Sequence, residues 1–272
     1  MSANPTPAAA PASDAPYVLK ESQNGAVRLT LNRGDRFNAL SSAMLGALQA
    51  RVDEVAADPD ARVVVLAAQG RGFCAGHDLK EMRAHAGDAA WQGRLFEDCS
   101  RLMLALTRLP QPVIARVHGI ATAAGCQLVS MCDLAVASDN ATFALPGVNV
   151  GVFCTTPAVG VGRNVARKRV MEMLLTGKPI DAATALAWGL VNRVVPSEKL
   201  DAAVAEFVDA ILARSPAVIS GGKRAFYDQI DRPLADAYDT AGDAMTRGVL
   251  LEDAGEGIDA FLQKREARWR GR

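Results

Sequence analysis

Two stretches of small residues have the composition and spacing that could do chemistry. The first, residues 70–82, is rich in glycine and lies between an apolar run and a short helical pattern. Glycine lets the backbone turn tightly and come close to a bound group. Because the turn ends where a helix begins, its backbone N–H groups are expected to lack partners and to attract negative charge. An ordinary turn from strand to helix would contain the same residues.

The second stretch, residues 118–128, repeats this arrangement: a short strand, a turn of small residues and an apolar helix. Small side chains would let two helix N-termini approach one ligand from different parts of the fold. Tight helix packing calls for the same residues, but the repetition favours a ligand site.

The elements that position these turns follow from hydrophobic periodicity. Residues 17–21 and 26–31 are predicted strands joined by Asn24-Gly25, a strong hairpin signal. Ser41 or Ser42 is expected to cap a helix whose apolar positions 44, 45, 48, 52 and 55 fit a period of 3.6. Residues 63–68 form a continuous apolar run typical of a buried strand. Further strands are expected at 113–117, 133–137, 141–145 and 190–195, and further helices at 79–85, 91–109, 158–165, 168–175 and 182–188.

From residue 200 onward the sequence is helical, with amphipathic helices predicted at 200–213, 217–229, 234–250 and 254–265. Four apolar stripes after a mixed core suggest a helical appendage that packs on a neighbouring chain, although packing on the chain's own core would give the same stripes. We therefore expect a tail (1–16), a core (17–198) and a helical oligomerisation region (199–272).

Composition and charge argue against several classes of function. At 272 residues the chain can bury one large core, or a core plus a smaller appendage. Thirty basic residues balance thirty acidic ones, which gives no reason to expect nucleic acid or a membrane as partner. No apolar run approaches the roughly 20 residues of a membrane-spanning helix. The five cysteines lack metal-binding spacing, so neither a metal site nor a disulfide framework is expected.

The tail is rich in alanine, proline and serine and is predicted to be disordered. It lacks the basic and apolar regions of a signal peptide and the arginines of a transit peptide. Together with the odd number of cysteines, this favours a cytoplasmic location.

Five motifs in order resemble those of a known family. Over residues 17–270 the pattern resembles the crotonase (enoyl-CoA hydratase/isomerase) superfamily. The resemblance implies an α/β (α+β) fold, a spiral of ββα units with a C-terminal helical trimerisation region. It also implies homotrimers that can pair into hexamers, and an acyl-CoA substrate that includes coenzyme A, with no separate cofactor. The motifs are Leu31-Asn32-Arg33 with Asn38-Ala39-Leu40, residues 73–82, Ala124-Gly125-Cys126 with residues 132–137, residues 143–146, and residues 174–177.

In this family two backbone N–H groups hold an enolate-like intermediate, and by position these catalytic donors are the amides of His77 and Ala124. Losing one such donor typically costs about 2.7–4 kcal/mol. Lys264 matches a lysine that meets the coenzyme A phosphates in relatives, or it is a solvated helix charge. The other substrate-binding positions that the resemblance implies are Arg33, Asn38, Ala39, Leu40, Ala75, Gly76, Asp78, Leu79, Gly125 and Gly147.

The sequence departs from the family where hydratases carry two glutamates, since Gln127 and Gly147 occupy those positions. Hydration needs one group that takes a proton from water and another that delivers one to the α-carbon. An amide does not titrate usefully near neutral pH, and glycine has no side chain. The sequence is therefore most similar to the hydratase-domain-containing branch that lacks both glutamates, and ordinary hydratase activity is expected to be reduced or altered.

Other residues near the expected pocket could take part in the chemistry. Gln127 could position a water or hydrogen-bond a substrate, or be a buried amide satisfied by the backbone. The amide of His77 is expected to matter more than its ring. Asp78 is expected to cap a helix, His118 to pack on the core and Cys154 to be a buried small hydrophobe, while Thr155 stands where thioester-hydrolysing relatives carry an aspartate.

Three hypotheses about function compete. The first is an acyl-CoA enzyme with lyase or isomerase chemistry run mainly by the two amides, of which malonyl-type decarboxylation is one version. The second is a catalytically silent acyl-CoA-binding protein. The third is a thioester hydrolase, for which no activated nucleophile is visible. All three predict binding of coenzyme A thioesters.

Overall fold

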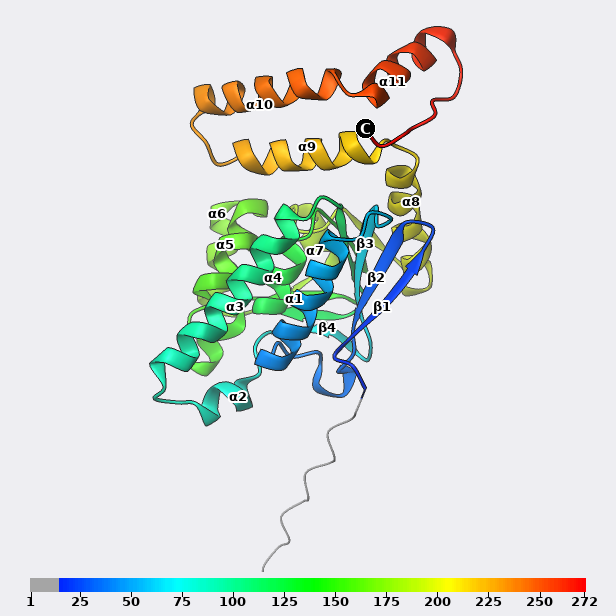
Figure 1. Ribbon diagram of the computed structural model, residues 1–272. Helices are drawn as coiled ribbons and strands as arrows, with labels where there is room; N and C mark the ends of the chain where they lie inside the picture. Colours follow the sequence, from blue (N-terminus) through cyan, green and yellow to red (C-terminus); the bar gives the residue numbers. More distant parts are fainter. Residues whose placement is uncertain (1–14) are drawn as a thin grey trace, which may run out of the picture.

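The computed structural model of the protein describes residues 15–272, so the predicted disorder of residues 1–14 lies outside the described residues. Two sheets form the core of the described part (Figure 1). The larger has the strand order β1-β2-β3-β5-β7-β10 and the smaller the order β4-β6-β8-β9. Except at the β1–β2 and β8–β9 pairs, neighbouring strands are parallel. The strands are β1 (Val18–Gln23), β2 (Ala26–Leu31), β3 (Val63–Ala68), β4 (Gly72–Cys74), β5 (Val113–Val117), β6 (Ile120–Thr122), β7 (Leu134–Ser138), β8 (Thr142–Ala144), β9 (Ile180–Asp181) and β10 (Arg193–Val195).

The chain passes repeatedly from the larger sheet to the smaller one. β3, β5 and β7 each lead into β4, β6 and β8, and helices follow each pair. This repeat confirms the predicted spiral of ββα units. Because β4 and β6 are parallel neighbours, their C-terminal ends lie at the same edge, which brings the two small-residue turns together. The helices that follow are α2 (Leu79–Ala84) and α3 (Ala89–Arg108), then α4 (Ala124–Ser130), then α5 (Thr155–Asn164) and α6 (Arg167–Thr176).

The N-terminal part follows the sequence pattern closely. Asn24 and Gly25 have φ angles of 50° and 85° and join β1 to β2, as the hairpin signal predicted. Helix α1 (Ser42–Ala56) is capped by Ser41, whose Oγ accepts a hydrogen bond from the Met44 N–H at 3.2 Å. The buried residues of α1 are the five predicted positions 44, 45, 48, 52 and 55.

Two helices begin earlier than predicted. Helix α3 starts at Ala89 because Oδ1 of Asp88 accepts from the Trp91 N–H at 2.9 Å and caps the first turn. Helix α5 starts at Thr155 and so includes Pro157. Proline is tolerated there because the N–H groups of the first helical turn have no partner within the helix.

The remaining connections agree with the turn signals. Gly177, with φ of 62°, ends α6. Asp181 caps α7 (Ala182–Ala187) by accepting from the Thr184 N–H at 2.7 Å. Short 3₁₀ turns are found at η1 (Gly34–Arg36), η2 (Pro146–Val150) and η3 (Ser197–Lys199).

The C-terminal helices divide into one that belongs to the core and three that do not. Helix α8 (Leu200–Leu212) buries Leu200, Ala203 and Val204 against the larger sheet. Helices α9 (Pro216–Gln229), α10 (Leu234–Val249) and α11 (Glu252–Gln263) form an arm in which α9 runs across the core and α10 lies beyond α9 (Figure 1). The predicted boundary at residue 199 thus precedes a helix that packs on the core, and the arm begins at Pro216.

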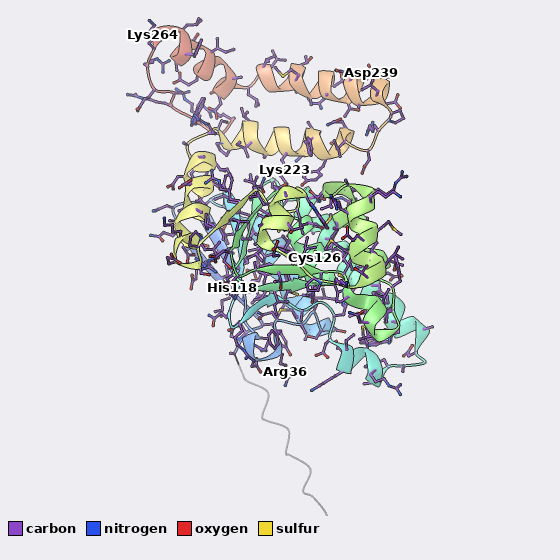
Figure 2. All side chains as sticks on the ribbon, turned by 180° about the vertical axis from the view of Figure 1, so that it is seen from behind. Arg36, His118, Cys126, Lys223, Asp239 and Lys264 are labelled. Carbon is purple, nitrogen blue, oxygen red and sulfur yellow. The ribbon has the colours of Figure 1, made fainter. Side chains whose placement is uncertain are left out.

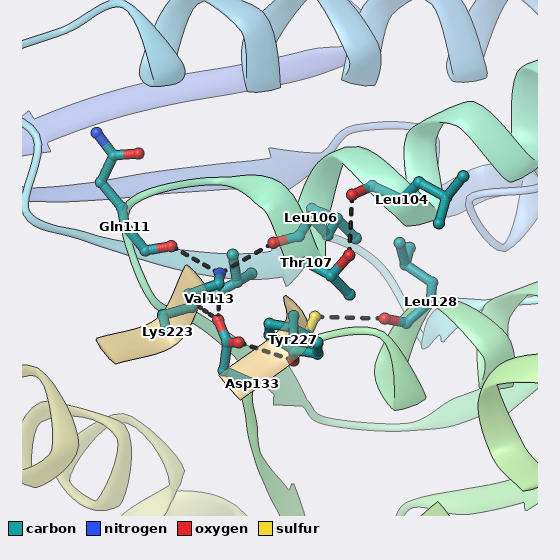
Figure 3. Close-up of polar contacts among 10 residues, drawn as sticks. Leu104, Leu106, Thr107, Gln111, Val113, Leu128, Asp133, Lys223 and Tyr227 are labelled. Carbon is teal, nitrogen blue, oxygen red and sulfur yellow. Dashed lines mark hydrogen bonds and ion pairs between the residues drawn. The ribbon is translucent and has the colours of Figure 1, made fainter. Parts of the chain in front are cut away.

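One partly buried polar cluster fastens the arm to the core (Figure 3). The Lys223 Nζ donates to the carbonyl oxygens of Leu106 and Gln111, both at 2.9 Å, and pairs with Asp133. The hydroxyl of Tyr227 and the N–H of Val113 also donate to the Asp133 carboxylate, at 2.9 and 2.7 Å. Helix α9 therefore has a fixed position on the chain's own core.

The chain after α11 folds back on the start of the arm. The buried Asp253 accepts hydrogen bonds from the N–H groups of Arg270 and Gly271, at 2.6 and 2.8 Å. The Trp269 ring donates to the Ala213 carbonyl at 2.8 Å. Helix α11 ends at Gln263, two residues before the predicted end, because Lys264 adopts a left-handed conformation with φ of 53°.

Candidate functional site

The two small-residue turns touch each other backbone to backbone. A Cβ atom on Gly76 would lie 2.9 Å from Cβ of Ala123 and 3.2 Å from the Ala124 nitrogen. A Cβ atom on Gly125 would lie 2.1 Å from the Cys74 carbonyl oxygen. Both positions therefore need glycine, and Gly76 also has a φ of 85°. The requirement comes from the contact between β4 and the start of α4.

Two backbone donors at this contact have no acceptor. Among residues 15–272, neither the His77 N–H nor the Ala124 N–H donates a hydrogen bond to a backbone carbonyl. Ala123, which precedes the second donor, has φ of 50° and ψ of −120°, a conformation that costs energy for a residue with a Cβ atom. Two such N–H groups can hold an oxygen that is negatively charged or becomes so during a reaction.

The His77 ring turns away from the solvent. Its Nδ1 lies 3.3 Å from the Leu40 carbonyl, and the ring meets Phe96 of α3 edge-on at 5.4 Å. Burial lowers the pKa of the imidazole and so favours its neutral form. A carbonyl can only accept, so Nδ1 carries the proton and Nε2 has a free lone pair. Nε2 is buried and has no partner within the described part of the chain.

Gln127 is buried, and its side-chain oxygen lacks a hydrogen-bond partner within the described part of the chain. It lies on α4 with 4% of its surface exposed, and its Oε1 has no hydrogen-bond partner among the described residues. The sequence leaves two interpretations of Gln127 open, a ligand contact or a buried amide satisfied by the backbone. The second does not apply to this oxygen, because no backbone group in residues 15–272 donates to it.

Gly147 has no room for a side chain. A Cβ atom there would lie 2.5 Å from the Val152 carbonyl oxygen and 2.9 Å from Sγ of Cys154. The Gly147 N–H donates to that sulfur at 3.3 Å, and the Val152 N–H donates to the Gly147 carbonyl at 3.0 Å. Cys154 is 8% exposed, and burial raises the pKa of its thiol. The sulfur fills space that a longer residue at 147 would need. Thr155 is the exposed first residue of α5.

The loop before α1 runs along the first turn, as expected for a wall of a shared site. The Leu40 N–H donates to the Gly76 carbonyl at 2.8 Å, and the Ala75 N–H to the Phe37 carbonyl at 3.0 Å. Asn38 is buried and left-handed, and its amide donates to the carbonyls of Gln69 and Gly72. These bonds bring residues 38–40 beside residues 75–77.

Three other predicted residues have structural partners. The Arg33 guanidinium donates to the carbonyls of Ala15 and Pro16, at 2.6 and 3.1 Å, and lies over the Tyr17 ring at 3.9 Å. Asp78 caps α2 as predicted, accepting from the N–H groups of Lys80 and Glu81 at 2.9 and 3.2 Å, and the adjacent Leu79 is 55% exposed. His118 lies with Nε2 at 2.9 Å from the Gly70 carbonyl.

Lys264 does not join the other predicted residues. Figure 2 shows it at the outer end of the arm, whereas Cys126, which follows Gly125, lies in the core. Within one chain, therefore, this lysine cannot reach the paired amides.

Several residues that shape the site were not anticipated from the sequence. The strained Ala123 has no sequence signal, because alanine is not expected at positive φ. The contact between Gly147 and Cys154 joins two different elements. The ion pair of Lys223 with Asp133 joins residues far apart in the chain. The described residues contain no group of three or more side chains suited to a metal ion. Across residues 15–272, no helix has the length and apolar character needed to cross a membrane.

Comparison with known proteins identifies the family. A profile described as enoyl-CoA hydratase/isomerase matches residues 21–272. The chain therefore belongs to the enoyl-CoA hydratase/isomerase family, which confirms the crotonase resemblance. The chain is 44% identical over 261 residues to the rat protein "Enoyl-CoA hydratase domain-containing protein 3, mitochondrial", covering 96% of this chain and 87% of that one.

Solved structures agree with this assignment. An enoyl-CoA hydratase from Mycobacterium smegmatis has a TM-score of 0.92 and 51% identity, covering 94% of this chain and 99% of that one. The structure of human enoyl-CoA hydratase domain-containing protein 3 has a TM-score of 0.90 and 43% identity, covering 93% of this chain and all of that one. Similarity to the hydratase-domain-containing branch was expected from the sequence and is confirmed.

The expected cytoplasmic location is wrong by the same comparison, because the rat and human relatives are named as mitochondrial proteins. The prediction rested on five cysteines without a disulfide pattern and on the composition of residues 1–16. The five thiols are free, and cysteines without a disulfide pattern do not distinguish one reducing compartment from another.

Proposed function

We propose that this protein binds an acyl-CoA thioester and holds its enolate-like intermediate between the N–H groups of His77 and Ala124. The observation that carries the proposal is a pair of N–H donors, at the contact of Gly76 with Ala124, that find no acceptor within residues 15–272. Charge develops on the thioester oxygen only as the reaction proceeds, so donors held in place beforehand lower the barrier. Coenzyme A enters as part of the substrate, and we propose no separate cofactor.

We further propose that its hydratase activity is reduced or altered. Gln127 and Gly147 stand where hydratases of the family carry glutamates, and neither supplies the acid and base that hydration needs. The close contact of Gly147 with Cys154 supports this view, because it leaves no space for a substitute side chain at that position. Lyase or isomerase chemistry that draws mainly on the two donors fits these residues best.

Two alternatives remain consistent with paired donors and with the lack of a glutamate at positions 127 and 147. A malonyl-type CoA decarboxylase needs little help beyond stabilisation of the enolate, and a catalytically silent acyl-CoA-binding protein would keep the same contacts. Thioester hydrolysis by a cysteine is less well supported, because burial raises the pKa of the Cys154 thiol and so disfavours the thiolate.

We propose that the arm joins chains into homotrimers, which can pair into hexamers. An open apolar cavity of about 960 Å³ is lined by α9, α10 and α11. Large apolar side chains of the arm are exposed, among them Leu250 at 80%, Phe261 at 82% and Leu234 at 75%. Large apolar side chains exposed along one set of helices are typical of a surface that another chain covers. In such an assembly Lys264 would meet the coenzyme A phosphates bound by a neighbouring chain.

The deciding experiment follows the absorbance of crotonyl-CoA with the purified protein and, in parallel, measures crotonyl-CoA binding by calorimetry. We expect binding with little or no hydration, and carbon dioxide release from malonyl-CoA if the decarboxylase version holds. Hydration at rates ordinary for enzymes would contradict the argument from the missing glutamates. Absence of any thioester binding would contradict the proposal as a whole.

A further inference from the structure

Residues 264–272 form a C-terminal segment without helix or strand that runs back along α11. It leaves the outer end of the arm and returns to the start of α9, where the C-terminus lies (Figure 1). The Trp269 indole N–H donates to the carbonyl of Ala213, which directly follows α8, at 2.8 Å. A Cβ atom on Gly257 of α11 would lie 3.2 Å from the same ring. The segment therefore fastens α11 to the junction of α8 and α9.

Two carboxylates of α11 bind this C-terminal segment. Glu256 accepts two parallel hydrogen bonds from the Arg265 guanidinium, at 2.6 and 2.9 Å, and a third from the Arg268 N–H at 2.8 Å. The buried Asp253 accepts from the Ser215 hydroxyl at 2.5 Å, as well as from the two N–H groups described above. Paired hydrogen bonds between a guanidinium and a carboxylate fix direction as well as distance. The segment thus follows one defined path along α11.

Lys264, the first residue of the segment, has a backbone conformation that favours glycine. Its φ and ψ are 53° and 43°, in the left-handed region. Helices commonly end with a residue in this conformation, and that residue is usually glycine because glycine has no Cβ atom. The Arg265 N–H donates to the Ala260 carbonyl at 3.0 Å across this turn. A lysine here is strained, and such strain persists only where neighbouring contacts hold the backbone.

The ammonium group of Lys264 has no partner within residues 15–272, in either a hydrogen bond or an ion pair. By contrast, Arg265 and Arg270 of the same segment pair with Glu256 and Glu252. The Lys264 side chain is exposed, and Figure 2 shows it at the outer end of the arm. The segment therefore presents the unpaired Lys264 cation from a fixed backbone, an arrangement suited to an anion outside the chain.

We propose that the C-terminal segment is a positioning device, in which Glu256 and Trp269 hold Lys264 where it meets an anionic group of a substrate bound by a neighbouring chain. The inference rests on the proposed function, in which that group is a phosphate of coenzyme A. Glu256 and Trp269 touch no substrate and act through Lys264. A lysine on a loose helix end would carry the same charge, but it would lose more conformational freedom on binding.

The test compares two thioesters by calorimetry: butyryl-CoA and butyryl-pantetheine, which carries the same acyl group but no phosphate. Glu256→Gln removes the carboxylate charge, and Trp269→Phe removes the indole N–H but keeps an aromatic ring. We expect each variant to bind butyryl-CoA about three- to tenfold more weakly, the effect of one side chain that must be ordered on binding. Butyryl-pantetheine should bind the wild type and both variants equally. Equal losses for the two thioesters, or no loss for butyryl-CoA, would overturn the inference.

A double-mutant cycle with Lys264→Met shows whether Glu256 acts through the lysine. Glu256→Gln should weaken butyryl-CoA binding in the wild type and have no further effect in the Lys264→Met background. Additive effects of the two substitutions would contradict a role through Lys264. Glu172→Gln is the matched control, because Glu172 is an exposed carboxylate paired with Arg169 on α6, outside the arm. It should leave both affinities unchanged.

Sedimentation of the same variants separates positioning from assembly. We expect Glu256→Gln and Trp269→Phe to keep the assembly state of the wild type. Loss of assembly in both would assign the segment a role in joining chains and would overturn the inference. If Lys264→Met leaves butyryl-CoA affinity unchanged, the inference falls and acyl-CoA binding stands. If neither thioester binds the wild type, acyl-CoA binding itself is wrong, and the inference falls with it.

Discussion

The ammonium group of Lys223 lies 2.6 Å from Oδ2 of Asp133, and the side chains are only 7% and 17% exposed. Lys223 belongs to the arm and Asp133 to the core, immediately before β7 (Figure 3). All three donor hydrogens of the ammonium group have acceptors, two of them carbonyls at the end of α3 and the turn that follows. The ion pair is therefore largely buried, every donor hydrogen of the ammonium group has an acceptor, and the pair holds the arm on the core.

Removing Lys223 should destabilise the protein strongly. Lys223→Met leaves the Asp133 carboxylate buried beside two unpaired carbonyls, and loss of one partner of a buried pair typically costs about 3–5 kcal/mol. Chemical denaturation measures the change, with Lys178→Met at an exposed lysine as the control. A loss no larger than in the control would mean that the pair does not hold the arm.

A side chain at position 147 should be destabilising. Gly147→Ala puts a Cβ atom 2.5 Å from the Val152 carbonyl and forces the loop to move, at about 1–3 kcal/mol. For the same reason Gly147→Glu should not create hydratase activity. Gly46→Ala is the matched control, because Gly46 lies in α1 with open space around it and should stabilise by roughly 0.5–1 kcal/mol. Thermal melting should show a lower melting temperature for Gly147→Ala and a higher one for Gly46→Ala.

Loss of one paired donor should slow any reaction that passes through an enolate. Replacing Ala124 by lactic acid converts its amide to an ester, which removes the N–H and keeps the methyl group. We expect a fall of about 10²–10³ in kcat on whichever thioester is turned over, with thioester binding largely retained. The same exchange at exposed Ala43 on α1 is the control. An unchanged kcat would rule out the Ala124 amide as a donor to the reacting oxygen.

Stability should fall as the pH drops below about 6.5, the ordinary pKa of an unfolded histidine. Burial lowers the pKa of His118 in the folded state, with Arg116 lowering it and the Gly70 carbonyl and Asp201 raising it. The unfolded chain binds the proton first, so the contribution of His118 is complete above that pH and is lost as pH falls through the folded pKa. Burial lowers the pKa of His77 in the same direction.

His118→Gln tests the source of this dependence. The new amide can still donate to the Gly70 carbonyl, but it does not titrate. Melting temperatures from pH 5 to pH 7.5 should therefore depend less on pH in the variant. Curves of the same slope for both proteins would assign the acid sensitivity to other groups.

A charge on the exposed apolar face of the arm should dissociate the proposed oligomer. Phe261 is 82% exposed on α11, and Phe261→Asp would place a carboxylate in the surface that we propose a second chain covers. Sedimentation should report trimers or hexamers for the wild type and monomers for the variant. Leu104→Asp, at a half-exposed position on α3, is the control. A monomeric wild type would remove the basis of the proposal.

Most of the fold was predictable because it depends on local patterns. The apolar stripe of α1, the run at β3 and the Asn24-Gly25 hairpin each mark an element without reference to the rest of the chain. The sequence pattern predicts a helix from residue 158, whereas α5 begins at Thr155, because the first turn of a helix tolerates Pro157. The division of the helices at residue 199 did not anticipate that α8 packs on the sheet.

The candidate site was predictable only in part. Glycines at 76 and 125 indicated the two turns, because glycine is required where two backbone segments come too close for a Cβ atom. The partners that Arg33 finds in Ala15 and Pro16, and the sulfur that occupies the space beside Gly147, arise from contacts between separate segments. Such contacts follow no local pattern, and the sequence alone does not specify them.

The arm's lack of a core of its own has a consequence for hydrogen exchange. Helix α10 contains no buried residue, whereas every residue of β3 is buried. In a single chain the amides of α10 can open locally without disturbing the core, at a free energy well below that of global unfolding. Deuterium should therefore enter α10 long before β3 in dilute protein. In the assembly that we propose, a second chain covers the arm, so deuterium should enter α10 more slowly as the protein concentration rises. The exchange rate of this one helix then measures the fraction of chains that are assembled.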